Sequence, residues 1–179
     1  MARISKDQYY INIAKEVAQR GTCFRAKHGA VIVCNDQIVA TGYVGAPRKT
    51  KDCLERGNCL RTELNIPSGQ RYELCRSVHS EQNAIINATR SGASLLDGTL
   101  YLYSCKIIEG AEDELINALP CFICKKMIIN SGIKTMVCMQ KDGSIKKYEI
   151  ENWIKDWQEN DLIDDKDKYD AAYAIKNKI

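Results

Sequence analysis

Two short stretches that lie far apart in the chain restrict its fold more than any other feature. The first runs from His79 to Glu81, and the second contains Cys121 and Cys124. One imidazole and two thiolates are ligands that Zn²⁺ prefers, and three protein ligands leave a fourth tetrahedral position open, which is typical of a catalytic site. Glu81 follows the histidine closely enough to reach a metal-bound water without being a ligand. We therefore predict a catalytic zinc bound by His79, Cys121 and Cys124, with Glu81 as the proton carrier.

Each stretch alone has a simpler explanation. A Cys-x-x-Cys pair also occurs in redox proteins and in structural zinc sites, and a His-x-Glu triplet occurs by chance. Both stretches, however, precede apolar residues at helical spacing: Ala84, Ile85 and Ala88 after the first, and Met127, Ile128 and Ile129 after the second. The partial positive charge of a helix N-terminus stabilises thiolates. Both ligand sets are therefore expected at helix N-termini, which favours the catalytic zinc site.

Length and composition predict a single domain over residues 1–179. The chain has 179 residues, of which 45% are hydrophobic and 27% charged, and its formal net charge of +3 is too small to indicate nucleic-acid or membrane binding. Residues 1–20 mix charged and apolar side chains, unlike a signal peptide, and no apolar run is long enough to cross a bilayer. We expect a cytoplasmic protein that does not bind membranes.

Hydrophobic periodicity predicts alternating helices and strands. Helices are expected over 5–19, 80–90 and from Cys121 to about 131, with a C-terminal helical extension over about 151–179 that includes a short helix at 171–175. Strands are expected at 30–34, 38–43, 99–104, 134–139 and 145–150, the first two and the last two joined by tight turns. A long polar loop over 45–76 and an acidic insertion over 105–119 separate these elements. Together they predict an α/β fold, a three-layer α/β/α sandwich around a mixed five-stranded sheet.

The motifs resemble those of the cytidine/deoxycytidylate deaminase family, most closely the dCMP deaminases of bacteria and phages. The segment HSEQNAI, from His79 to Ile85, is similar to the family's His-Ala-Glu motif, Leu119 to Cys124 resembles its Pro-Cys segment, and Gly42 to Pro47 resembles its Gly-Tyr-Asn-Gly-x-Pro loop. The similarity extends from about Tyr10 to Val137. It implies a cytidine deaminase-like fold.

The resemblance also implies an activity, the zinc-dependent hydrolysis of a cytosine nucleotide, dCMP, to dUMP and ammonia. In that reaction zinc makes hydroxide available near neutral pH, and Glu81 moves a proton from water to N3 of the pyrimidine and then to the leaving amino group. The implied partner is a small-molecule nucleotide, and the implied assembly is a homo-oligomer.

Two other functions share the same metal chemistry or the same fold. One is deamination of a base in tRNA or single-stranded DNA, which the weak positive charge disfavours. The other is a non-catalytic, zinc-stabilised nucleotide-binding module, which the presence of Glu81 disfavours because a structural site needs no proton carrier.

The resemblance assigns substrate contacts to four positions. Ser80, where the family has alanine, contacts the base through its backbone N–H, and Asn83 favours nucleotide deaminases. Val44 replaces the asparagine that binds the sugar in relatives, so that either the sugar is held more weakly or the pocket takes a different nucleotide. Arg90 has the spacing of a phosphate-binding residue, although a basic side chain in the last turn of a helix is also favoured by the helix dipole.

The nine cysteines of the chain are an odd number, which argues against a closed set of disulfides. Cys23, Cys53, Cys59 and Cys75 lie in or beside polar segments. They are the candidates for a second, closed zinc site of the kind that some resembling deaminases carry, and such a site would hold the long loop. The alternative is a set of unpaired thiols.

Overall fold

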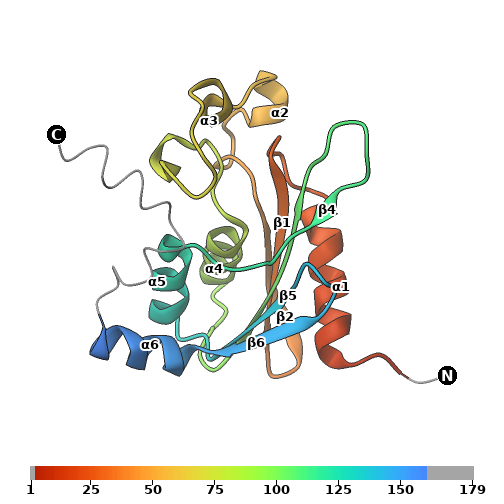
Figure 1. The fold of residues 1–179 in the computed structure, drawn as a ribbon. Helices are drawn as coiled ribbons and strands as arrows, with labels where there is room; N and C mark the ends of the chain where they lie inside the picture. The colour runs from red at the N-terminus through yellow and green to blue at the C-terminus, as the bar shows by residue number, and fades with distance from the viewer. Residues whose placement is uncertain (1–2, 161–179) are drawn as a thin grey trace.

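The structure is a computed structural model that describes residues 3–160, and its centre is one mixed β-sheet (Figure 1). The strands are β1 (Ala26–Cys34), β2 (Gln37–Tyr43), β3 (Thr99–Lys106), β4 (Glu114–Leu115), β5 (Thr135–Met139) and β6 (Ile145–Glu149). Their order is β2-β1-β3-β5-β6, with β4 paired to β3. All neighbours are antiparallel except β3 and β5, which are parallel. The five predicted strands are confirmed, and β4 is a short sixth strand that the prediction lacked.

Helices cover both faces of this sheet. Figure 1 shows α1 (Lys6–Ala18) on one face and α4 (Ser80–Arg90) with α5 (Phe122–Asn130) on the other. The helix α6 (Ile150–Glu159) follows the edge strand β6, and no helix within residues 3–160 has the length and apolar character needed to cross a bilayer. The predicted three-layer α/β/α arrangement is therefore confirmed. The helix predicted at 171–175 lies outside the described residues.

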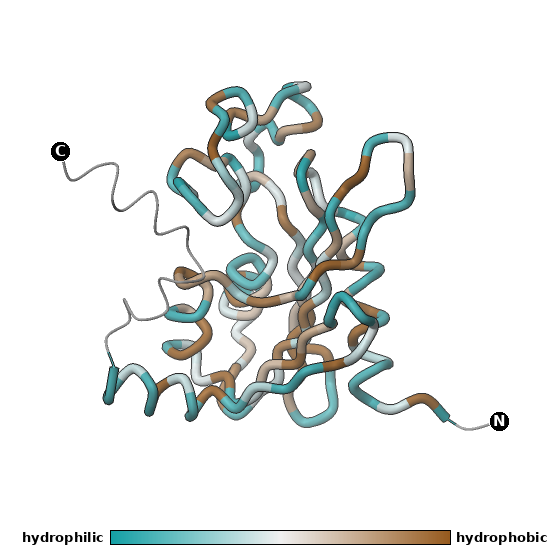
Figure 2. Tube along the Cα trace, in the orientation of Figure 1, coloured by the Kyte–Doolittle hydropathy of each residue, from teal (hydrophilic) through white to brown (hydrophobic). Residues whose placement is uncertain are grey.

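The central strands alternate between two apolar cores. On β1, Ala30 and Ile32 pack with residues of α4 and α5, whereas Val31 and Val33 pack with residues of α1. The strands β3 and β5 repeat this alternation, because successive side chains of a strand point to opposite faces. Figure 2 shows apolar segments along the central strands, whereas the outer loops mix hydrophilic and hydrophobic residues. The sheet therefore presents an apolar surface to both helical layers.

The two long connections fold over the same end of the sheet. The loop after β2 contains the short helices α2 (Cys53–Arg56) and α3 (Leu60–Glu63) and the 3₁₀ turn η1 (Tyr72–Leu74), and Figure 1 shows these above the strands. The acidic insertion turns back so that β4 pairs with β3, and Lys27 forms an ion pair of 2.7 Å with Asp113. Both connections are thus positioned to form walls above the N-terminus of α4.

One glycine allows α4 to approach the sheet closely. A Cβ atom at Gly42 of β2 would lie 2.3 Å from the backbone nitrogen of Ala84 and 2.3 Å from the carbonyl oxygen of Ser80. Both are backbone atoms, so the helix itself would have to move. The position of the first predicted ligand set therefore depends on a missing side chain in β2.

We predict that Gly42→Ala destabilises the protein by about 1–3 kcal/mol, the usual cost of overpacking a core. Urea unfolding monitored by circular dichroism measures this change. Gly45→Ala is the matched control, because its Cβ would meet only side-chain atoms, at 3.2 Å or more. Equal stability of the two variants would contradict the proposed close contact.

Candidate active site

The structure brings the three predicted metal ligands into one cluster. The Nδ1 atom of His79 lies 3.3 Å from the sulfur of Cys121 and 3.4 Å from the sulfur of Cys124. The three ligand atoms lie within 4.8 Å of one another, and no other group of this kind was found within residues 3–160. The spacing suits ligands that surround a single ion.

Two helix starts hold this cluster in place. His79 is the N-cap of α4, where the Gln82 side chain accepts a hydrogen bond of 3.0 Å from its backbone N–H. Cys121 is the N-cap of α5, and Cys124 lies in its first turn. The prediction that both ligand sets lie at helix N-termini is therefore confirmed. Each helix directs unpaired backbone N–H groups and the positive end of its dipole towards the site.

The protonation of the two thiols indicates that the cluster suits a divalent cation. A hydrogen bond with Cys124, opposed by burial and reinforced by His79, lowers the pKa of Cys121 to about 5. The same hydrogen bond, together with burial, raises the pKa of Cys124. A second thiolate beside the first and near Glu81 is thus unfavourable without a compensating positive charge. Zn²⁺ provides that charge and prefers this set of nitrogen and sulfur ligands, so the residues fit the metal.

Glu81 lies next to the cluster without belonging to it. Its side chain is buried, and the hydroxyl of Ser80 donates a hydrogen bond of 2.9 Å to its Oε2 atom. The Tyr72 ring packs edge-on against the His79 ring, with centroids 4.7 Å apart, and burial raises the pKa of Tyr72 to about 12, so its hydroxyl stays neutral. A buried carboxylate that accepts a hydrogen bond from Ser80 and lies beside a metal cluster is suited to carrying protons.

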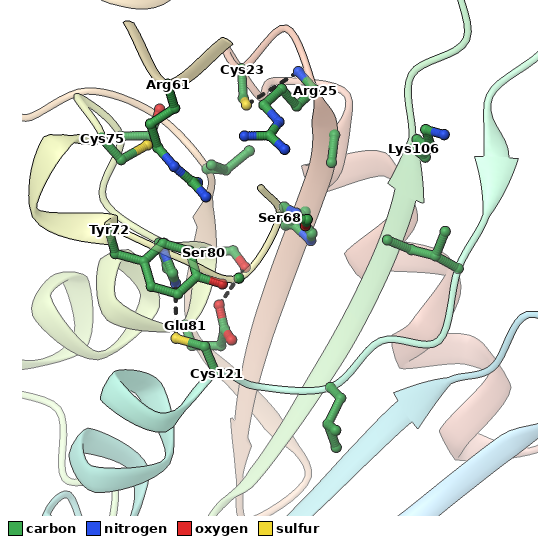
Figure 3. Close-up of a pocket in the computed structure, with 18 of the residues that line it drawn as sticks. Cys23, Arg25, Arg61, Ser68, Tyr72, Cys75, Ser80, Glu81, Lys106 and Cys121 are labelled. Atoms are coloured by element: carbon green, nitrogen blue, oxygen red, sulfur yellow. Dashed lines mark hydrogen bonds between the residues drawn. The ribbon is translucent and has the colours of Figure 1, made fainter. Parts of the chain in front are cut away.

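These groups lie in a cavity of about 630 Å³, a volume within the usual range for small-molecule sites. Figure 3 shows Glu81 and Cys121 on one side of it and the side chains of Arg25 and Arg61 on the opposite side. The remaining walls come from the start of β1, the loop after β2, the end of β3 and the insertion, whose Ile116 lines the cavity. The two long connections therefore enclose the site.

Of the four residues predicted to contact the substrate, two line the cavity and two do not. Ser80 and Val44 line the cavity. The amide nitrogen of Asn83 donates instead to the carbonyl of Tyr43, at 2.8 Å, and so fixes the loop after β2 against α4. Arg90 is exposed at the far end of α4 and does not line the cavity. Within this chain the structure gives the expected phosphate role of Arg90 no support.

Arg25, Arg61 and His28 are among the lining residues that the sequence analysis missed. Arg25 and Arg61 come from polar loop segments without a motif, and only the folded loop shows that they face the site. His28 lies on β1 in register with Ser104 of β3, and its Nδ1 is 2.8 Å from the Ser104 hydroxyl. A signal for His28 was present, because it is polar and two residues before the buried Ala30, on the same face of the strand.

The four cysteines expected at a second zinc site also gather. Cys23, Cys53, Cys59 and Cys75 all line one small cavity of about 20 Å³ beside the long loop. Their sulfurs do not form a ligand group like that of His79, Cys121 and Cys124 in the described part of the chain. The structure therefore places the four residues around a common space, and their binding of zinc stays a prediction.

Comparison with known proteins agrees with the site. Residues 4–140 match the family model described as the cytidine and deoxycytidylate deaminase zinc-binding region. The chain is 32% identical over 142 residues to the deoxycytidylate deaminase of Mycobacterium phage D29, covering 76% of this chain and 96% of that protein. The crystal structure of dCMP deaminase from the cyanophage S-TIM5 in apo form has a TM-score of 0.52 and 25% identity, covering 74% of this chain and 81% of that one.

The yeast relatives are longer proteins. The deoxycytidylate deaminase of Schizosaccharomyces pombe is 31% identical over 135 residues, which are 75% of this chain but 37% of that protein. The chain thus spans well under half the length of this relative and nearly all of the phage protein.

We predict that Cys124→Ala removes one zinc ion per chain relative to the wild type, because two protein ligands do not complete a stable site. Glu81→Ala should keep the wild-type zinc content, since the carboxylate is not a ligand. Inductively coupled plasma mass spectrometry of both purified variants measures this. Loss of zinc from Glu81→Ala would show that the carboxylate is a ligand.

Proposed function

The chain belongs to the cytidine and deoxycytidylate deaminase family, and on that basis we propose that it hydrolyses dCMP to dUMP and ammonia. The observation that carries this proposal is the cluster of His79, Cys121 and Cys124 beside the buried Glu81, at one side of a cavity large enough for a nucleotide. The deoxycytidylate deaminase of phage D29, which the chain matches over 96% of its length, supports this choice of substrate.

The reaction divides between the metal and Glu81. His79, Cys121 and Cys124 would hold the zinc, which would supply the Lewis acidity that makes hydroxide available near neutral pH. Glu81 takes the released proton and delivers it to N3 of the pyrimidine while C4 is attacked. Glu81 then takes the proton of the hydroxyl now bound at C4 and gives it to the amino group. The C4–N bond breaks, the C4 carbonyl forms and ammonia leaves, so one water is consumed for each ammonia formed. Ser80 keeps Oε2 of Glu81 oriented for both transfers, through the hydrogen bond of its hydroxyl.

The charge distribution of the cavity supports a nucleotide over a nucleoside. Arg61 is only 7% exposed, and its Nε atom has no hydrogen-bond partner within residues 3–160. One terminal nitrogen of Arg61 donates to the carbonyl of Pro67 and one of Arg25 to the carbonyl of Ile66, so both guanidinium groups are held beside the cavity. Neither forms an ion pair with a carboxylate among the described residues. A phosphate would supply the missing negative charge.

The two alternative functions have weaker support. A net charge of +3 gives little of the electrostatic attraction that nucleic-acid substrates need, and the long loop and the insertion both wall the site. A non-catalytic module would not need a buried carboxylate beside the metal ligands. As further parts of the proposal, we expect a homo-oligomer that acts on a cytoplasmic nucleotide pool.

We also propose that Cys23, Cys53, Cys59 and Cys75 bind a second, structural zinc. Support comes from their common cavity and from Cys59, whose pKa is lowered because hydrogen bonds from Thr62 and from the Arg61 backbone outweigh the opposing effect of burial. Four thiolates make a closed tetrahedral site without a position for water.

Zinc analysis tests this second site. We expect two zinc ions per chain in the wild type and one in Cys53→Ser, with Cys34→Ser as the control because Cys34 does not line the small cavity. One zinc ion per chain in the wild type would show that the four cysteines are unpaired thiols.

Ammonia release from zinc-loaded protein tests the proposed activity. Incubation with dCMP, deoxycytidine, dCTP and a cytosine-containing oligonucleotide should give turnover highest for dCMP and none in Glu81→Ala. Turnover highest for the oligonucleotide would favour the nucleic-acid alternative, and absence of turnover on all four would favour the non-catalytic module.

The same assay separates the arginines. Arg61→Gln should lower kcat/KM for dCMP by about 10- to 100-fold, because a hydrogen bond to a charged group is worth about 1.5–3 kcal/mol, and it should leave deoxycytidine unaffected. Arg90→Gln is the matched control and should behave as the wild type. A loss of kcat/KM for dCMP in Arg90→Gln, without a loss in Arg61→Gln, would assign phosphate binding to Arg90.

A further inference from the structure

His28 of β1 lines the cavity. It lies in register with Ser104 of β3, and on its other side its carbonyl accepts a hydrogen bond of 3.1 Å from the N–H of Val44, which continues the pairing of β1 with β2. Both His28 and Val44 line the cavity that contains Glu81. The three side chains therefore form a row across the sheet, with the imidazole in the middle.

The imidazole is fixed through one nitrogen and free at the other. Its Nδ1 atom is 2.8 Å from the hydroxyl of Ser104, a residue that is only 2% exposed. Its Nε2 atom has no hydrogen-bond partner within residues 3–160. This atom is not fully buried, so a ligand in the cavity can reach it. A ring held by a buried serine thus offers one unused hydrogen-bonding atom to the cavity.

The ring is neutral near pH 7. Burial, the largest effect, lowers the pKa of His28, and the charge of Glu81 opposes this only in part. A neutral imidazole has one donor and one acceptor nitrogen, and the bond to Ser104 decides which of them is Nε2. A hydroxyl group can pair with Nε2 in either case, because it both donates and accepts.

Along the chain, His28 lies between Arg25 and the apolar core that β1 contributes. Arg25 lies three residues before His28, roughly 10 Å along an extended chain, and the apolar core begins with Ala30. Glu81 and the metal ligands occupy the side of the cavity opposite Arg25 and Arg61 (Figure 3). In a nucleotide the sugar lies between the phosphate and the base, so a sugar held by this cavity would lie near His28.

We propose that Nε2 of His28 hydrogen-bonds the 3′-hydroxyl of the substrate's deoxyribose, an inference that rests on the deaminase function proposed above. Val44, the cross-strand neighbour of His28, has no polar atom to offer in its side chain. Recognition of the sugar is therefore assigned to β1, and Ser104 is the positioning residue that orients the ring.

Paired substrates test this contact. The wild type should prefer dCMP to 2′,3′-dideoxycytidine monophosphate in kcat/KM, and His28→Val should reduce turnover of dCMP about 2- to 12-fold, the range for one neutral hydrogen bond, while leaving the dideoxy analogue unchanged. His28→Gln should restore part of the preference, because its amide both donates and accepts. Ser104→Ala should give a smaller loss than His28→Val.

A transposed pair provides the sharpest control. Since Val44 and His28 face the same space, the double variant His28→Val with Val44→Asn should regain preference for the 3′-hydroxyl, whereas Val44→Asn alone should not strengthen it. Equal losses on both substrates in His28→Val would overturn the proposal and indicate contact with the base or general packing. Unchanged preference in His28→Val would overturn it as well. Zinc content and thermal unfolding of each variant exclude misfolding as the cause.

A binding experiment separates this proposal from the deaminase function. Isothermal titration calorimetry with dUMP and with 2′,3′-dideoxyuridine monophosphate needs no turnover. A weaker affinity of wild type for the dideoxy compound, and loss of that difference in His28→Val, would support the sugar contact even if no substrate were deaminated. Equal affinity for both compounds in the wild type would overturn it even if dCMP were deaminated.

Discussion

The meeting of two helix N-termini over one face of the sheet is the constraint on which the rest of the structure depends. The helix α4 follows β2 and α5 leads to β5, and each begins beside the same end of the sheet, so that His79 and Cys121 both act as N-caps. Two thiols and a carboxylate would repel one another there if all were ionised. The helix dipoles reduce that repulsion, and a divalent cation removes it. The ligand set and the position of Glu81 follow from this arrangement, and the missing side chain at Gly42 permits it.

The cavity is electrostatically divided because its two ends are built by different parts of the chain. The ordered helices supply the end that contains Glu81 and the metal ligands, whereas the loop after β2 and the start of β1 supply Arg61 and Arg25. A ligand with an anionic end and a neutral, polar end can bind the arginine end of the cavity with the first and the Glu81 end with the second. No negative charge then approaches Glu81. His28 and Val44 also line the cavity, and neither adds a charge to it near neutral pH, because burial lowers the pKa of His28.

The sequence predicted the elements that depend on local periodicity and missed the contacts that depend on loop conformation. Helix and strand positions, the hairpin after Cys34 and the two helix N-termini follow from spacing alone, and the structure agrees with them. Arg90 shows the limit of spacing, because eleven residues of α-helix carry a side chain roughly 16 Å along the axis from His79. Arg61 lies close to the site although it is far from any motif, because the loop folds back over the cavity.

The small cavity of the four cysteines and the larger cavity share a wall, and this links loop order to substrate binding. Arg25 and Arg61 line both cavities, as do Cys23 and Cys75. Cys23 and Cys59 each precede one of these arginines by two residues, so whatever holds the sulfurs also sets the backbone from which the guanidinium groups extend. The Arg61 side chain in turn lies over the Tyr72 ring, 5.0 Å from its centroid, and Tyr72 contacts His79. A continuous series of contacts therefore runs from the cysteine cavity through the arginine end to the metal ligands. These contacts order the long polar loop after β2 at the place where it lines the larger cavity.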